Sequence, residues 1–248
     1  MRRTSRQPPT VVRLPSFPRS LFIKERWLYK EGEHVSFLGP TGSGKTTLEF
    51  ELMQDSANPD LRAIILVVKP RDETIDEWNK KLQFPIVRDW PPHDLKRFWY
   101  RDKSGWVLWP RHAFDPEKDD KHLHDVLRRA LLDAYKRGHT ITVVDEAFGA
   151  ANELKLAKEL ITIWSRGRSM GNGLWAGTQK PSHVPTWFYS QAHHLFLAND
   201  PDERNRERFG EIGGIDSKVI EEIVIGLKKF EFLYIRREGP RFCKIIPD

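Results

Sequence analysis

The chain has 248 residues, of which 39% are hydrophobic, which is enough for one large α/β domain with a substantial core. Its single cysteine, Cys243, excludes an internal disulfide framework and a cysteine-based zinc cluster, and it lies in an apolar stretch typical of a buried strand. No stretch approaches the about 18 uncharged apolar residues of a membrane span, and the basic start lacks the apolar core of a secretory signal. We therefore expect a cytoplasmic protein without a membrane span.

The net charge of +6 is concentrated at the N-terminus. Residues 1–30 contain eight lysines and arginines and one glutamate, whereas the remaining 218 residues contain 33 basic and 34 acidic residues. We therefore predict a basic, proline-rich arm over residues 1–31, in which prolines disfavour a helix, followed by a near-neutral domain over residues 32–248. Two interpretations of the arm stay open: contact between its arginines and phosphates, or a solvated tail without a partner.

The predicted elements alternate between strands and helices. Strands are expected at residues 33–39, 62–68, 106–110, 140–146, 173–179 and 193–199. Helices are expected from about Thr46, over residues 72–82, from Asp119 or Asp120 to near Gly138, over residues 154–164 with an end at Gly171, and over residues 216–227. Residues 230–246 predict a hairpin that turns at residues 238–240. The fold class is therefore α/β, with a central, mostly parallel sheet flanked by helices and a C-terminal β-hairpin.

Four tryptophans lie between Trp90 and Trp109, in a region that the elements above leave mostly unassigned. Two interpretations of these tryptophans stay open: they pack in the core, or they belong to a loop that contacts a ligand or a polymer. Arg97, Arg101, Lys103 and Arg111 are interleaved with aromatic residues here and could follow a nucleic-acid backbone.

Residues 39–46, GPTGSGKT, match the phosphate-loop pattern G-x-x-x-x-G-K-[ST] and lie between a predicted strand and a predicted helix. The glycines allow successive N–H groups to surround an anion, and the helix N-terminus adds its dipole. The predicted ligand is a polyphosphate, with Lys45 at the β- and γ-phosphates and the Thr46 hydroxyl on Mg²⁺. The predicted nucleotide-binding residues are Gly39, Pro40, Thr41, Gly42, Ser43, Gly44, Lys45, Thr46 and Thr47.

The stretch TVVDEA supplies a second part of the site. Its β-forming residues place Asp145 and Glu146 at the carboxyl end of a strand, where α/β sheets bind ligands. Asp145 is expected to bind Mg²⁺ through water, and Glu146 is expected to polarise the water that attacks the γ-phosphate. A carboxylate in that place favours hydrolysis over phosphate transfer to a small molecule.

Gln179 ends the strand that follows, where its amide could contact the γ-phosphate and the attacking water if the strands have the usual order. Arg166 and Arg168 lie at the end of the preceding helix. Such cations compensate a helix dipole, but they could also act as an arginine finger in the site of a neighbouring subunit. The sequence does not choose between the two arginines.

The combination of GPTGSGKTT, TVVDEA and RGRSMGNGLWAGTQKPSHVP resembles the FtsK/HerA superfamily of P-loop ATPases, from about Glu33 to Asn199. The resemblance implies an ASCE, RecA-like fold, ATP and Mg²⁺ as cofactors, Asp145 and Glu146 as the Walker B pair, Gln179 as sensor, and Arg166 or Arg168 as the finger. It also implies a homo-oligomeric ring, pentameric or hexameric, that moves non-specifically along double-stranded DNA.

A bare motor of this length is most similar to viral and phage genome-packaging ATPases, which dock transiently on portal or vertex proteins of a capsid. We therefore expect an ATP-driven packaging motor. The alternatives are a HerA-like DNA-processing translocase, a nucleotide-gated virion or extrusion assembly protein, and a small-molecule kinase. Glu146 and the strand that ends at Gln179 argue against the kinase.

Overall fold

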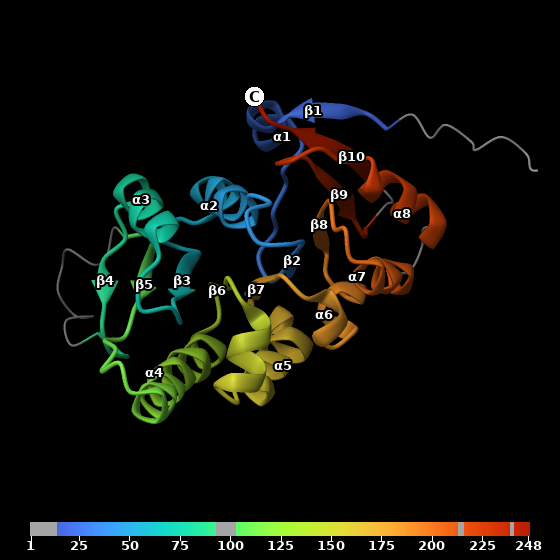
Figure 1. The fold of residues 1–248 in the computed structure, drawn as a ribbon. Coiled ribbons are helices and arrows are strands. Elements are labelled where there is room, and N and C mark those ends of the chain that lie inside the picture. Colours follow the sequence, from blue (N-terminus) through green and yellow to red (C-terminus); the bar gives the residue numbers. More distant parts are fainter. Residues whose placement is uncertain (1–13, 93–102, 213–215, 239–240) are drawn as a thin grey trace, which may run out of the picture.

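The computed structural model describes residues 14–92, 103–212, 216–238 and 241–248. One ten-stranded sheet runs through the molecule in the order β1-β10-β9-β8-β2-β7-β6-β3-β5-β4 (Figure 1). The seven strands from β8 to β4 are parallel to one another. Strand β9 is antiparallel to both β8 and β10. The predicted α/β fold with a mostly parallel sheet and an antiparallel C-terminal hairpin is therefore confirmed.

The strands are β1 (Ser16–Pro18), β2 (Val35–Leu38), β3 (Arg62–Leu66), β4 (Ile86–Val87), β5 (Gly105–Leu108), β6 (Thr140–Val144), β7 (Asn172–Thr178), β8 (His194–Ala198), β9 (Phe232–Arg236) and β10 (Arg241–Ile246). The helices are α1 (Arg19–Glu25), α2 (Lys45–Ser56), α3 (Glu73–Leu82), α4 (Pro116–Arg137), α5 (Ala157–Arg166), α6 (Trp187–Ser190), α7 (Glu203–Glu207) and α8 (Ser217–Ile225). A π-helical turn (Gly149–Glu153) precedes α5, and a 3-10 turn (Gly167–Met170) follows it.

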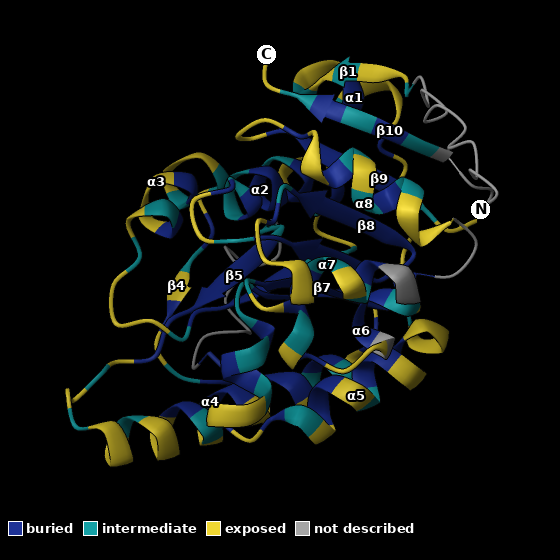
Figure 2. Cartoon of the chain, turned by 45° about the vertical axis from the view of Figure 1, so that its right-hand side comes forward, coloured by how far each residue is buried: buried dark blue, intermediate teal, exposed yellow. Residues whose placement is uncertain are grey.

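Each face of the sheet has its own hydrophobic core. Helices α1, α2 and α3 cover one face through side chains such as Phe22, Met53 and Trp78. Helices α4, α5 and α8 cover the other through side chains such as Leu127 and Trp164. The central strands are buried on both sides (Figure 2), which explains why their sequences are continuous apolar runs rather than alternating ones.

Helix α4 begins earlier than the sequence analysis predicts. It starts at Pro116 with Asp115 as N-cap, whose carboxylate accepts a hydrogen bond from the backbone N–H of Lys118. Proline is favoured at the first position of a helix, so Pro116 indicates this start, which the spacing of apolar residues alone does not. Asp119, which was predicted to start the helix, instead accepts hydrogen bonds from the backbone N–H groups of Ala113 and Phe114.

The second half of the predicted arm packs onto the sheet. Strand β1 pairs in parallel with β10, and α1 starts directly after Pro18, the last proline of the arm. Phe22 and Trp27 are buried in the core. The basic residues 1–13 lie outside the described part of the chain, so the division at residue 31 stays a prediction.

Three of the tryptophans between residues 90 and 109 are core residues. Trp90, Trp106 and Trp109 are buried, and the Trp90 and Trp106 rings pack edge to face with centroids 5.9 Å apart. Trp99, Arg97 and Arg101 lie outside the described residues. None of the helices in the described ranges combines the length and apolar composition that a membrane span needs.

Candidate nucleotide-binding site

The phosphate loop connects the central strand β2 to helix α2, as the motif requires. Two of its glycines are required by geometry. Gly39 has a φ of +151°, and a Cβ built there would lie 2.6 Å from the Cβ of Ala198 on β8. Gly44, with a φ of +90°, is the left-handed residue directly before α2, whose N-terminal N–H groups face the loop. The loop and the N-terminus of α2 together have the geometry of an anion-binding turn.

Lys45 is the first residue of α2, and its ammonium group lies within the loop. Its Nζ donates to the carbonyl oxygens of Gly39 at 2.7 Å and of Pro40 at 2.9 Å. Burial lowers the pKa of Lys45, and the nearby carboxylates of Asp145 and Glu146 offset part of this effect. The ammonium group is thus held where a phosphate oxygen could replace the carbonyls as its partner.

Thr46 and Asp145, the two predicted metal-side residues, are in direct contact. The Thr46 hydroxyl donates to Oδ1 of Asp145 at 2.8 Å, across the gap between the phosphate loop and the end of β6. A hydroxyl and a carboxylate are hard oxygen donors that suit Mg²⁺. The described residues contain no group of three or more histidine, cysteine or acidic side chains that could hold a metal ion.

Glu146 follows Asp145 at the carboxyl edge of the sheet. Its Oε1 accepts hydrogen bonds from the backbone N–H of Phe148 at 3.2 Å and from the hydroxyl of Thr178 at 3.4 Å. Burial raises the pKa of the Glu146 carboxyl. A higher pKa makes the carboxylate a better proton acceptor, which suits the predicted general base.

Gln179 lies beside the phosphate loop. It follows β7, which pairs with β2 on one side and with β6 on the other, so the predicted strand order is observed. Its Oε1 accepts a hydrogen bond from the Thr41 hydroxyl. The amide therefore lies between the loop and the strand that carries the acidic pair.

Lys69 belongs to the same site, although no motif indicated it. It follows β3, which pairs with β6, and its Nζ lies 3.0 Å from Asp72 and 3.4 Å from Asp145. Burial alone would lower the pKa of Lys69, but the two carboxylates outweigh it and the pKa is raised. A lysine directly after a buried parallel strand was the available sequence signal.

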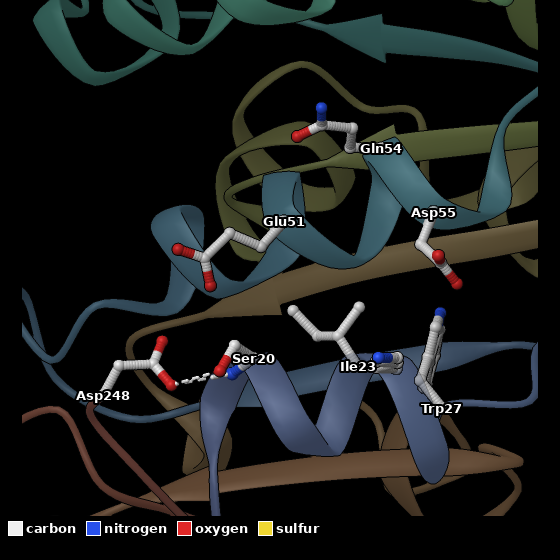
Figure 3. A pocket seen from close by; sticks show the side chains of 8 residues that line it. Ser20, Ile23, Trp27, Glu51, Gln54, Asp55 and Asp248 are labelled. Carbon is white, nitrogen blue, oxygen red and sulfur yellow. Dashed lines mark hydrogen bonds between the residues drawn. The ribbon is translucent and has the colours of Figure 1, made fainter.

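Most of these residues line a hollow of about 490 Å³, whereas Glu146 is not part of its lining. Its walls comprise Thr41, Gly42, Gly44, Lys45, Thr46, Thr47, Lys69, Asp72, Thr74, Asp145, Gln179, Lys229 and Phe230. A second hollow of about 670 Å³ lies between α1 and α2 (Figure 3). Its lining holds three carboxylates, Glu51, Asp55 and Asp248, and one cation, Lys24, and Glu51 already pairs with Arg19, which disfavours a polyphosphate there.

Arg166 and Arg168 lie at the other edge of the sheet. Both precede the start of β7, whereas the phosphate loop and Gln179 follow the ends of their strands. Arg168 pairs with Glu238 at 3.3 Å. Arg166 is exposed, and its guanidinium group forms no ion pair within the described residues. The fold therefore does not bring either arginine to the site of its own chain.

One buried histidine lies in a strongly polar environment, away from the nucleotide site. His194 is fully buried, and its two ring nitrogens lie 2.8 Å from the Tyr234 hydroxyl and 2.8 Å from a carboxylate oxygen of Glu33. Glu33 is remote in sequence, so residue spacing did not reveal the pair. The pair lies at the start of β2 and β8, away from the phosphate loop.

No protein-family model matches the chain, and no curated protein is similar to it in sequence. Solved structures do match. The DNA-packaging ATPase B204 of Sulfolobus turreted icosahedral virus is 18% identical, with a TM-score of 0.62 over 89% of this chain and 100% of that one. The genome-packaging NTPase B204 of Sulfolobus turreted icosahedral virus 2, in complex with AMPPCP, is 16% identical, with a TM-score of 0.58 over 87% and 98%.

VirB4 of Thermoanaerobacter pseudethanolicus is 12% identical, with a TM-score of 0.64 over 87% of this chain and 89% of that one. At these identities the matches establish the fold. The chain therefore shares its fold with the DNA-packaging ATPase B204 and with VirB4, which is consistent with the FtsK/HerA-type resemblance of its motifs.

Proposed function

We propose that the chain is an ATP-hydrolysing translocase of double-stranded DNA, and specifically the motor that drives a viral genome into a capsid. One observation carries the proposal: the phosphate loop, Asp145, Glu146 and Gln179 converge on one edge of the sheet, in a fold shared with packaging ATPases. The motor works as a homo-oligomeric ring of five or six subunits, in the host cytoplasm, and docks on portal or vertex proteins.

The residues divide the work of hydrolysis. The loop N–H groups and Lys45 hold the β- and γ-phosphates of ATP, and Thr46 and Asp145 hold Mg²⁺. The metal neutralises phosphate charge when bound. Glu146 accepts a proton from the water whose oxygen forms the new bond to the γ-phosphorus, while the bond to the ADP oxygen breaks. Gln179 orients that water or the γ-phosphate.

Steady-state ATPase activity with and without linear duplex DNA tests this function. We expect random-sequence duplex to stimulate turnover several-fold, because a motor couples hydrolysis to its track, and we expect little dependence on sequence. The Lys45→Ala variant serves as the control for contaminating activity. A kinase would turn over ATP only with a small acceptor molecule, and an assembly protein would show little turnover with or without DNA. Stimulation of turnover by one duplex sequence alone would indicate a site-specific DNA enzyme.

The basic N-terminus is expected to contribute phosphate contacts. Residues 1–20 contain five arginines, but Arg19 is engaged within the fold, where it pairs with Glu51 and donates to the carbonyl of Phe230. Residues 1–13 contain the other four arginines and no acidic residue. If all four contact duplex phosphates, deleting residues 1–13 should reduce the salt slope of log affinity by roughly 0.9 for each.

The measurement is duplex binding at several salt concentrations, with intrinsic ATPase activity as the check that the nucleotide site is intact. A variant in which the four arginines become glutamine provides the matched control for chain length. An unchanged salt slope in both variants would assign the arm to a protein partner or to no partner.

A further inference from the structure

The turn between α8 and β9 places an aromatic side chain in an unfavourable backbone conformation. The backbone N–H of Glu231 donates to the carbonyl of Lys228 at 3.0 Å, so Phe230 is the third residue of a four-residue turn. Its φ is +67°, a left-handed value for which glycine or asparagine is the usual choice. Phenylalanine in such a place is strained, and strain of this kind persists where the surrounding structure holds it, often at functional sites.

Other contacts hold the turn in place. The Glu231 carboxylate accepts a hydrogen bond from the backbone N–H of Lys228 at 2.8 Å and pairs with Lys244 of β10 at 3.3 Å. Arg19 of α1 donates to the carbonyl oxygen of Phe230 at 3.2 Å. The backbone of the turn is thus fixed from two sides, yet Phe230 remains 42% exposed.

The turn lies beside the phosphate loop, on the side away from the acidic pair. Because β9 is antiparallel to β8, with Phe232 opposite Ala198, the start of β9 reaches the carboxyl edge of the parallel strands (Figure 1). In the sheet order, β6 with Asp145 lies two strands from β2 on one side, and β9 lies two strands away on the other. The Phe230 ring approaches Gly44 so closely that a Cβ there would lie 3.0 Å from a ring atom.

The acidic pair and Phe230 lie on opposite sides of the phosphate loop, as the two ends of a bound nucleoside triphosphate would. The γ-phosphate end belongs near Asp145 and Glu146, so the base extends toward the opposite side of the loop. There Phe230 lines the main hollow together with Thr47 and also borders a smaller hollow of about 260 Å³ on the far side of the loop. The ammonium group of Lys229 lies 4.8 Å from the centre of the Phe230 ring and adds a cation to this wall.

We propose that Phe230 is the stacking platform for the nucleobase of the bound nucleotide, held in its strained turn so that the ring faces the base beside Gly44. The inference rests on the proposed function, since it assigns the base end of the same nucleotide site. An aromatic side chain can stack on any base, because every base has a π-face. The platform therefore contributes affinity for nucleotides in general.

The test compares ATP with inorganic tripolyphosphate, each with Mg²⁺, by calorimetric titration of the full chain. Loss of a stacking partner weakens binding by about 5- to 150-fold. We therefore expect Phe230→Ala to weaken ATP binding by such a factor and to leave tripolyphosphate binding unchanged, whereas Phe230→Trp should retain ATP affinity. Phe230→Gly removes the ring and relieves the backbone strain, so it should lose ATP affinity without losing thermal stability.

Phe114→Ala is the matched control, because Phe114 is also an exposed phenylalanine with a positive φ, of 60°, but lies outside the hollow. Unchanged ATP affinity in Phe230→Ala would overturn the inference, as would an equal loss for both ligands, which would make the ring a support of the phosphate loop. If the unaltered chain binds neither ligand, the proposed function fails, and the inference fails with it.

Discussion

Glu146→Gln is expected to retain ATP binding and to lose turnover by about 10²- to 10⁴-fold, the usual contribution of a general base. Glutamine keeps the side-chain oxygen that accepts hydrogen bonds from Phe148 and Thr178, so the half-buried side chain can stay in place. Its amide cannot take the proton of the attacking water. Single-turnover hydrolysis and equilibrium binding of ATP, measured on the same preparation, separate the two effects.

Lys45→Ala is the complementary variant, for which we expect loss of ATP binding itself. Its ammonium group lies inside the loop, where it donates to the carbonyls of Gly39 and Pro40. Of the other lysines that line the hollow, Lys69 pairs with Asp72 and Asp145, and Lys229 lies over the ring of Phe230. Hydrolysis at an unaltered rate in Glu146→Gln would show that another group serves as the base.

The parts of the site that the sequence predicts are those formed by local motifs. The phosphate loop needs a strand, three glycines and a helix in succession, and the acidic pair needs a buried strand directly before it. Both patterns are contained in short stretches of chain. Their convergence on one edge then follows from the parallel sheet, whose order places β7 and Gln179 between β2 and β6.

The parts that the sequence does not predict depend on contacts between distant segments. Strand β1 has three residues and exists by pairing with β10 at the other end of the chain. Helix α1 is short and is fixed by burial of Phe22 rather than by its own periodicity. Lys69 and Phe230 belong to no motif, and they reach the site only because β3 is parallel to β6 and β9 is antiparallel to β8.

Alanine in place of the trans-acting arginine is expected to reduce turnover by about 10³-fold or more, with little change in ATP affinity. Arg166 and Arg168 are matched variants for this test, because they are two residues apart at the amino edge of the sheet and both are far from the phosphate loop of their own chain. Arg168 is restrained by Glu238, whereas Arg166 is free of ion pairs within the described residues. The variant that keeps its turnover is the control for the one that loses it.

Mixed rings then distinguish a finger from a structural arginine. A Lys45→Ala subunit has no working phosphate loop but keeps both arginines, and an arginine-to-alanine subunit keeps its phosphate loop but lacks the finger. When both occupy one ring, the intact loop of the second meets the intact arginine of the first across their interface, so part of the lost activity should return. A loss without any recovery, in rings confirmed to contain both subunits, would assign the arginine to folding of its own chain, and turnover unaffected by either substitution would exclude both as fingers.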